Sequence, residues 1–108
     1  MQEIVQDGKV THIRLVRGDS FYATLTIERN GETYTPVEGD VISFAMSKDG
    51  VTAVEKTVDN ETLLLAIYPA DTADLEYGVY SFDIQITTVG GDVDTFIRGD
   101  FTLEKEVA

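Results

Sequence analysis

The stretch from Leu63 to Thr87 decides the fold that this sequence predicts, and it reads LLLAIYPADTADLEYGVYSFDIQIT. From Gly78 onward apolar and polar residues alternate, and one face consists of Tyr80, Phe82, Ile84 and Ile86. A period of two is typical of a β-strand with one buried face. The apolar run before it ends at Pro69, which cannot donate to a strand ladder. We therefore expect two strands joined by one helical turn over residues 70–75, with Asp71 at its N-terminus.

The residues before Tyr80 form a recognisable corner. An acidic residue, a glycine and a tyrosine follow at intervals of two, as Glu76, Gly78 and Tyr80. This spacing resembles the corner before the sixth strand of immunoglobulin-type sandwiches, where the tyrosine hydroxyl bonds to backbone and the ring packs in the core. Phe82 stands where many of those domains carry a disulfide cysteine. The alternative is that Gly-Val-Tyr merely begins an ordinary strand.

Turn residues divide the rest of the chain into further short strands. Asn30-Gly31 suits a two-residue hairpin, and Gly39-Asp40, Asp49-Gly50 and Gly90-Gly91 mark other turns. Between them we expect strands over residues 10–16, 20–28, 41–47, 53–58 and 93–104. Strand 53–58 is polar enough for a sheet edge, where Lys56 discourages pairing. The spacing predicts an all-β, immunoglobulin-like antiparallel β-sandwich of seven to eight strands.

The last strand, residues 93–104, combines two features. Strict alternation places Val93, Thr95, Ile97, Phe101 and Leu103 on one face and Phe96, Arg98, Asp100 and Thr102 on the other. Gly99 interrupts it and predicts a bulge or kink. Residues 1–9 are expected to be a flexible or strand-pairing arm, and residues 10–108 a single domain, since a chain of 108 residues suits one core.

The composition excludes several classes of function. The net charge is −12, and no basic stripe is present to bind nucleic acid or an anionic membrane. The chain has no cysteine, which excludes disulfides and thiolate metal sites and fits a reducing compartment. The N-terminus lacks the basic and apolar regions of a signal peptide, and the longest apolar run is too short to span a bilayer. We expect a protein made in the cytoplasm.

The candidate catalytic or metal-binding residues are weak. His12, the only histidine, is expected on an outward face with no hydrolytic partner nearby in the sequence. Paired carboxylates occur at Asp59/Glu61, Asp71/Asp74 and Asp92/Asp94, and such pairs can bind calcium, but turns favour Asp for other reasons. We assign no catalytic, metal or cofactor residues, and leave a small calcium-dependent or hydrolytic protein as an alternative.

Two motifs and three aromatic residues could contact partners. Arg-Gly-Asp occurs at residues 17–19 and 98–100, and we interpret both copies as glycine kinks flanked by exposed charges, which could pair across the sheet. Integrin adhesion requires the tripeptide at a mobile loop tip. Tyr22, Tyr34 and Phe96 are expected at outward or loop positions, where they form a possible partner surface. The alternative for Phe96 is that a shift of one residue turns it inward.

The whole chain resembles a family of small proteins encoded among the structural genes of tailed phages and prophages of Gram-positive bacteria. It is similar to the N-terminal immunoglobulin-like domain of phage baseplate upper proteins. The residues that carry this resemblance are Arg17-Gly18-Asp19-Ser20, Gly39-Asp40, Phe44-Ala45-Met46-Ser47-Lys48 and, most specifically, the block from Pro69 to Ile84. The resemblance implies a virion or baseplate component that acts by assembly, without catalytic residues.

The resulting prediction is a non-enzymatic structural or adaptor component of a phage particle, without a cofactor. Its partners would be copies of itself or other tail and baseplate proteins, and it would be virion-associated. Unpaired strand edges and exposed aromatic residues would supply the contacts. The alternative is a carbohydrate- or cell-surface-binding module, which needs aromatic residues grouped on one face.

Overall fold

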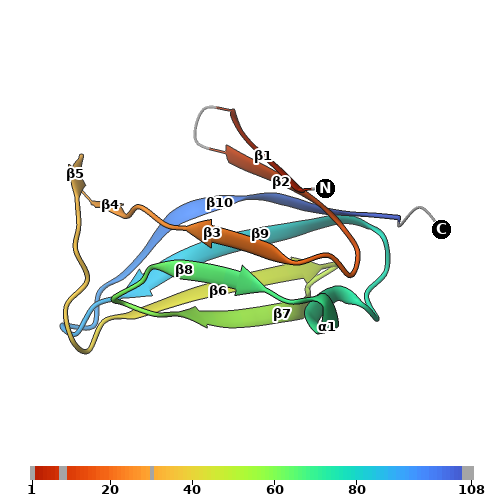
Figure 1. Cartoon of the computed structure of the whole chain (residues 1–108). Helices are drawn as coiled ribbons and strands as arrows, with labels where there is room; N and C mark the ends of the chain where they lie inside the picture. The colour runs from red at the N-terminus through yellow and green to blue at the C-terminus, as the bar shows by residue number, and fades with distance from the viewer. Residues whose placement is uncertain (1, 8–9, 30, 106–108) are drawn as a thin grey trace.

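A computed structural model describes residues 2–7, 10–29 and 31–105, and places the side chains of residues 11–28 and 31–105. These residues form strands and one short helix (Figure 1), so the prediction of an all-β protein is confirmed. The described elements are β1 (Gln2–Asp7), β2 (Val10–Val16), β3 (Phe21–Thr24), β4 (Glu28–Arg29), β5 (Glu32–Thr33), β6 (Val41–Lys48), β7 (Val51–Val58), β8 (Leu64–Ile67), α1 (Pro69–Thr72), β9 (Gly78–Thr87) and β10 (Val93–Glu104).

The strands form one large and two small sheets. The large sheet has six strands in the order β1-β2-β10-β9-β6-β7, β3 pairs with β8, and β4 with β5. The strand β2 runs parallel to β10, so the expectation of a purely antiparallel fold is wrong. Parallel neighbours need a long connection, and here the chain between β2 and β10 passes through β3 to β9.

The described residues contain ten strands, more than the seven to eight expected. Residues 2–7 pair with β2 as an edge strand, in line with the strand-pairing alternative for the N-terminal arm. The expected strand over residues 20–28 is divided into β3 and β4. Asn30 of the predicted hairpin turn, Met1, Gly8, Lys9 and residues 106–108 lie outside the described residues.

The core lies between the large sheet and the β3–β8 sheet. The inward sets predicted from alternation are buried there, among them Ile13 and Leu15 of β2, Phe44 and Met46 of β6, and Phe82 and Ile84 of β9. Four phenylalanine rings meet at its centre, with Phe101 within 6.3 Å of Phe21, Phe44 and Phe82 between ring centroids. Full burial of one such side chain stabilises the fold by about 1.5–3 kcal/mol.

A bulge in β10 changes the predicted faces of that strand. The register against β9 shifts between Thr95 and Ile97, which leaves Phe96 as the extra residue. Val93 and Thr95 are therefore exposed, and the prediction that they share the inner face with Phe101 is wrong. Gly99 has another role than the predicted bulge or kink, because a Cβ there would lie 1.7 Å from the Thr11 carbonyl oxygen. The glycine allows β2 and β10 to pair.

The prediction that residues 53–58 form an edge strand is confirmed, since β7 is the last strand of the large sheet. Lys56 lies opposite Phe44 in the β6–β7 register and thus starts from the core-facing side of β7. Its ammonium group reaches Asp71 of α1, at 2.7 Å. A charge that points inward on an edge strand disfavours pairing with another chain.

The molecule is elongated, 47 × 28 × 26 Å, and its two ends differ. We call residues 17–20, 48–50 and 68–78 the corner end, and the loops 36–41, 59–63 and 88–93 the valine end. These two sets lie at opposite ends of the strands (Figure 1). No helix among the described residues is long and apolar enough to cross a membrane.

Candidate functional site

The tyrosine corner has the geometry expected from its spacing. The Tyr80 hydroxyl donates to the Glu76 carbonyl oxygen at 2.8 Å, and the ring is buried. Lys48 lies beside it, with its Nζ donating to the Tyr77 carbonyl oxygen at 3.3 Å. Gly78 has a φ of 134°, a conformation that L side chains rarely adopt. Glu76, Gly78 and Tyr80 thus set the path of the chain into the central strand β9.

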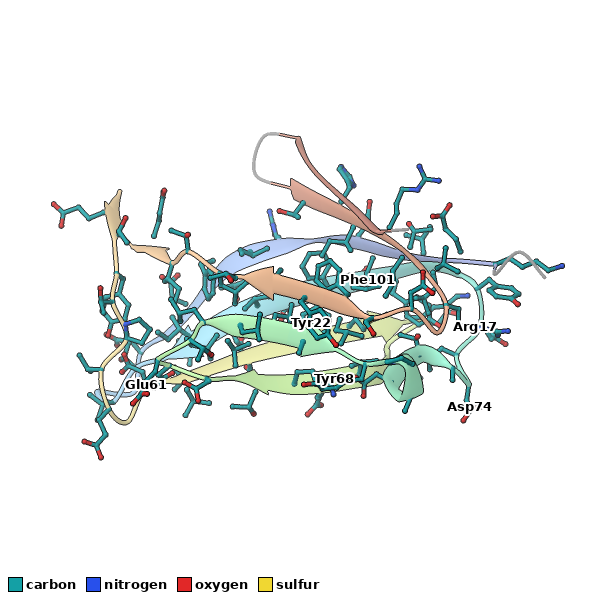
Figure 2. The ribbon with its side chains drawn as sticks, viewed as in Figure 1. Arg17, Tyr22, Glu61, Tyr68, Asp74 and Phe101 are labelled. Atoms are coloured by element: carbon teal, nitrogen blue, oxygen red, sulfur yellow. The ribbon has the colours of Figure 1, made fainter. Side chains whose placement is uncertain are left out.

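The first Arg-Gly-Asp copy is fixed against the corner (Figure 2). The Arg17 guanidinium donates to the Leu75 carbonyl oxygen at 3.0 Å and to the Tyr77 hydroxyl at 2.7 Å, and lies 4.1 Å from the Tyr77 ring centroid. The Gly18 amide donates to the hydroxyl of Thr72, which is fully buried, at 3.0 Å. The tripeptide therefore joins the β2–β3 turn to the α1–β9 segment.

The second copy lies within β10 and is paired across the sheet. The Asp100 carboxylate contacts His12 Nδ1 of β2 at 3.0 Å, and Arg98 lies opposite Asp83 of β9. Ser81 is the other cross-strand neighbour of Asp100. This row places the carboxylate between the serine and the histidine, whereas a hydrolytic triad needs the imidazole in the middle. The row therefore lacks the order of a hydrolytic triad.

Asp71 completes the start of α1. Its carboxylate accepts from the Tyr68 amide at 2.7 Å and from Lys56, so it reaches back to the residue before the helix as the sequence indicates. Partial burial alone would raise the pKa of Asp71. The hydrogen bonds from Lys56 and Tyr68 and the charge of Lys56 outweigh burial, and the pKa lies below its ordinary value of 3.8.

Asp40 holds the valine end together. Its Oδ2 accepts from the Tyr34 hydroxyl at 2.5 Å and from the Val37 amide at 3.0 Å, while Oδ1 accepts from the Val89 amide at 2.9 Å. Asn60 donates to the Asp40 carbonyl oxygen at 2.7 Å. One buried carboxylate and one amide side chain thus connect three loops that are far apart in the sequence. The sequence marked Asp40 as a turn residue and as part of the family resemblance, but not as the anchor of these loops.

The three aromatic residues predicted as a partner surface contact different parts of the molecule. Tyr22 of β3 is 51% exposed and packs edge-to-face with Tyr68, with ring centroids 6.1 Å apart (Figure 2). Tyr34 is half-buried and bound to Asp40. Phe96 is half-buried against the core, because the bulge turns it toward the inside. The exposed aromatic pair is thus Tyr22 with Tyr68, and the sequence analysis did not include Tyr68.

Sequence reasoning also missed the exposed valines of the valine end. They are Val37, Val41, Val89 and Val93. Each lies beside a Gly-Asp or Gly-Gly-Asp turn, where a valine is indistinguishable from the first residue of a half-buried strand. The signal that could have found them is their recurrence next to turns, which here meet at one end of the fold.

The carboxylate pairs do not converge on a cation site. Asp59 instead accepts from the amides of Glu61 and Thr62 in its own loop, at 2.7 and 3.3 Å. Within the described part of the chain, no group of three or more His, Cys, Asp or Glu side chains could hold a metal ion. Comparison of the sequence with models of known protein families gave no match, and neither did comparison with curated proteins.

Proposed function

We propose that this protein is a non-enzymatic structural or adaptor component of a phage or prophage particle, in its tail or baseplate, and that it is an immunoglobulin-like β-sandwich. It is made in the cytoplasm of the bacterial host and becomes virion-associated by binding other particle proteins or copies of itself. It uses no cofactor, nucleic acid or membrane.

One observation supports the proposal most. Two separate segments that carry the resemblance to the phage family, Arg17–Ser20 and the block from Pro69 to Ile84, bind each other directly. A third segment contacts the same corner, since Lys48 donates to the Tyr77 carbonyl oxygen, whereas Asp40 of the fourth anchors the valine end. Three of the four segments that carry the resemblance thus meet at the corner end.

The topology supports the immunoglobulin-like part of the proposal. The order β10-β9-β6-β7 corresponds to the G, F, C and C′ strands of such domains, and β3 with β8 to strands B and E. The tyrosine corner precedes β9, which takes the place of strand F. The departure is in the second layer, where β3 and β8 have no further strand beside them in the described residues.

The free edge of the large sheet supports assembly. The sheet ends in β1, whose outer edge carries backbone groups that could pair with another protein. At the other edge, the inward Lys56 of β7 disfavours such pairing.

The test is to induce the prophage in the bacterium that carries this gene, purify the particles by density gradient and quantify this chain by mass spectrometry. A constant number of copies per particle, in a ratio to the major tail protein that survives a second gradient, is the expected result. A chain found only in the soluble lysate would contradict the proposal.

A carbohydrate- or cell-surface-binding module is the second candidate, and the Tyr22–Tyr68 pair favours it. Both rings are 51% exposed and Lys56 Nζ lies 5.3 Å from the Tyr68 ring centroid. Aromatic faces beside polar groups can stack on sugar rings. Binding to a glycan array that is lost in Tyr22→Ser/Tyr68→Ser, but retained in Tyr77→Ser, would establish this function; an array without signal for the unmodified protein would exclude it for those glycans.

A further inference from the structure

The valine end gathers apolar surface that the fold does not bury. Its four valines are between 49% and 69% exposed. Val41 and Val93 flank Thr87 in adjacent strands, and Val89 lies against Gly39, where a Cβ would come within 2.9 Å of its Cγ2. Single exposed valines are ordinary in soluble proteins, but several gathered at one end of a molecule make a candidate interaction site.

A cleft adjoins this patch. It has a volume of about 830 Å³ and lies between residues 36–41 and residues 57–61. Val37 and Val41 belong to one wall, and Asp59 and Glu61 to the other. Figure 2 shows Glu61 at this end of the molecule, opposite Arg17 and Asp74. Because the exposed Glu38 also lines the first wall, the cleft offers one occupant valines with acidic side chains on both walls.

The loops that form the patch are tied together before any partner arrives. Asp40 accepts hydrogen bonds from the Val37 and Val89 amides, and Asn60 donates to the carbonyl oxygens of Val37 and Asp40. These bonds order three loops in the unbound protein. Ordering in advance reduces the entropy cost of association, so even a modest patch can bind usefully.

The charge of the valine end is of one sign. Its three loops, extended by one or two residues to 35–41, 57–63 and 87–93, contain five acidic residues and no Lys, Arg or His. Asp40 is buried and bonded within the fold, and the exposed acids are Glu38, Asp59, Glu61 and Asp92. An apolar centre with a charged rim is the usual anatomy of a protein–protein interface. Because this rim is acidic, the complementary rim is basic.

We propose that the valine end docks a protein segment that carries aliphatic side chains flanked by Lys or Arg. This inference rests on the proposed assembly function, because it takes the partner to be a protein. It adds the chemistry of that partner and the surface to which the partner binds. A second copy of this chain fits less well, because two valine ends brought together about a two-fold axis would face acid to acid.

The experiment selects from a yeast-displayed library of random peptides of about twelve residues on the full-length protein, and then measures the affinity of soluble versions by fluorescence anisotropy. We expect selected peptides rich in Lys or Arg and aliphatic residues, with affinity that falls as salt screens the acidic rim. Val89→Ser/Val93→Ser is expected to weaken binding about tenfold or more, because two apolar contacts are lost.

The matched control is Val51→Ser/Val79→Ser, which changes two valines of similar exposure outside the valine end. It is expected to bind as the unmodified protein does. Selected peptides of another composition, no selected peptide, or equal loss in both variants would overturn the inference. Light scattering tests a separate outcome, which is dimerisation. If the unmodified protein is a dimer and Val89→Ser/Val93→Ser is a monomer, the partner at the valine end is a second copy and not a basic segment. That result would overturn this inference and leave the proposed assembly function intact. Particles that contain the chain without valine-end binding would likewise overturn only this inference.

Discussion

The corner end and the valine end are both tied by side-chain bonds, but different kinds of side chain supply those bonds. At the corner end, cations take part in the bonding: Arg17 and Lys48 bind carbonyl oxygens, and Lys56 pairs with Asp71. At the valine end, a buried carboxylate does this work, and the outside is left to valines and unneutralised acids. The corner end sets the course of the chain into β9, whereas the valine end carries the exposed valines that we propose as a docking surface.

The largest expected effect comes from removing the carboxylate at the valine end. Asp40→Ala leaves the Val37 and Val89 amides and the Tyr34 hydroxyl without their acceptor. A buried donor that loses its acceptor costs about 1–3 kcal/mol, and these three donors are only partly buried, so we expect a total loss of about 3 kcal/mol in the free energy of unfolding. Urea unfolding followed by tyrosine fluorescence measures it.

Asp40→Asn is the matched control, because it keeps one oxygen acceptor at nearly the same volume. We expect it to lose less stability than Asp40→Ala. If both variants were as stable as the unmodified protein, the loops of the valine end would not depend on Asp40, and the ordered docking surface would be in question.

The corresponding change at the corner end is Arg17→Ala. It removes the hydrogen bonds to the Leu75 carbonyl oxygen and the Tyr77 hydroxyl, and the stacking on the Tyr77 ring. The bond to the Leu75 carbonyl oxygen is partly buried. We expect a loss of about 1.5 kcal/mol, since a charged hydrogen bond and an exposed cation–π contact are each worth about that or less. Arg17→Lys keeps the charge without the planar fork and should recover only part of the loss. Equal stability of all three proteins would refute the bracing role of the turn.

Tyr80→Phe tests the corner itself with a smaller change. The ring stays in the core, but the hydrogen bond to the Glu76 carbonyl is lost. The expected cost is about 1 kcal/mol. Tyr22→Phe, at an exposed ring, is the control and should stay within about 0.5 kcal/mol of the unmodified protein by thermal unfolding. A control as destabilised as Tyr80→Phe would argue against the corner bond.

The smallest effect concerns Asp71 and depends on pH. Its pKa in the folded state lies below the ordinary value of 3.8, so its stabilisation is present above that value and is lost as pH falls through the lower, folded-state pKa. Asp71→Asn should therefore cost about 1 kcal/mol at pH 7, and the difference from the unmodified protein should shrink in acid below 3.8. Unfolding at a series of pH values measures it. A difference that grew in acid would have the wrong sign.

The sequence predicted the strands of the large sheet because their alternation is local. The faces of β6 and β9 follow directly from a period of two, and burial of Phe44 and Phe82 agrees. The tyrosine corner was also accessible, because its residues are separated by fixed short intervals. In both cases the residues that determine the structure lie within a few positions of one another in the sequence or within a single strand.

The features that could not be predicted from the sequence depend on contacts between segments that are far apart in the chain. The bulge at Phe96 reverses the faces before it, yet a bulge has no residue signature of its own here. The parallel pairing of β2 with β10 depends on where the chain returns after some eighty residues. The valine end is invisible for the same reason, since Val37 and Val89 become neighbours only when Asp40 joins their loops.

The central claim is that the corner end stabilises the fold and the valine end binds a partner. The most direct test measures two quantities, the free energy of unfolding and the affinity for a selected basic peptide, for Arg17→Ala and for Val89→Ser/Val93→Ser. The account predicts that Arg17→Ala loses stability and keeps its affinity. Val89→Ser/Val93→Ser is predicted to keep its stability within about 0.5 kcal/mol, because exposed valines contribute little, and to lose its affinity. Two variants that lose both properties together, or a valine variant that loses only stability, would contradict the account.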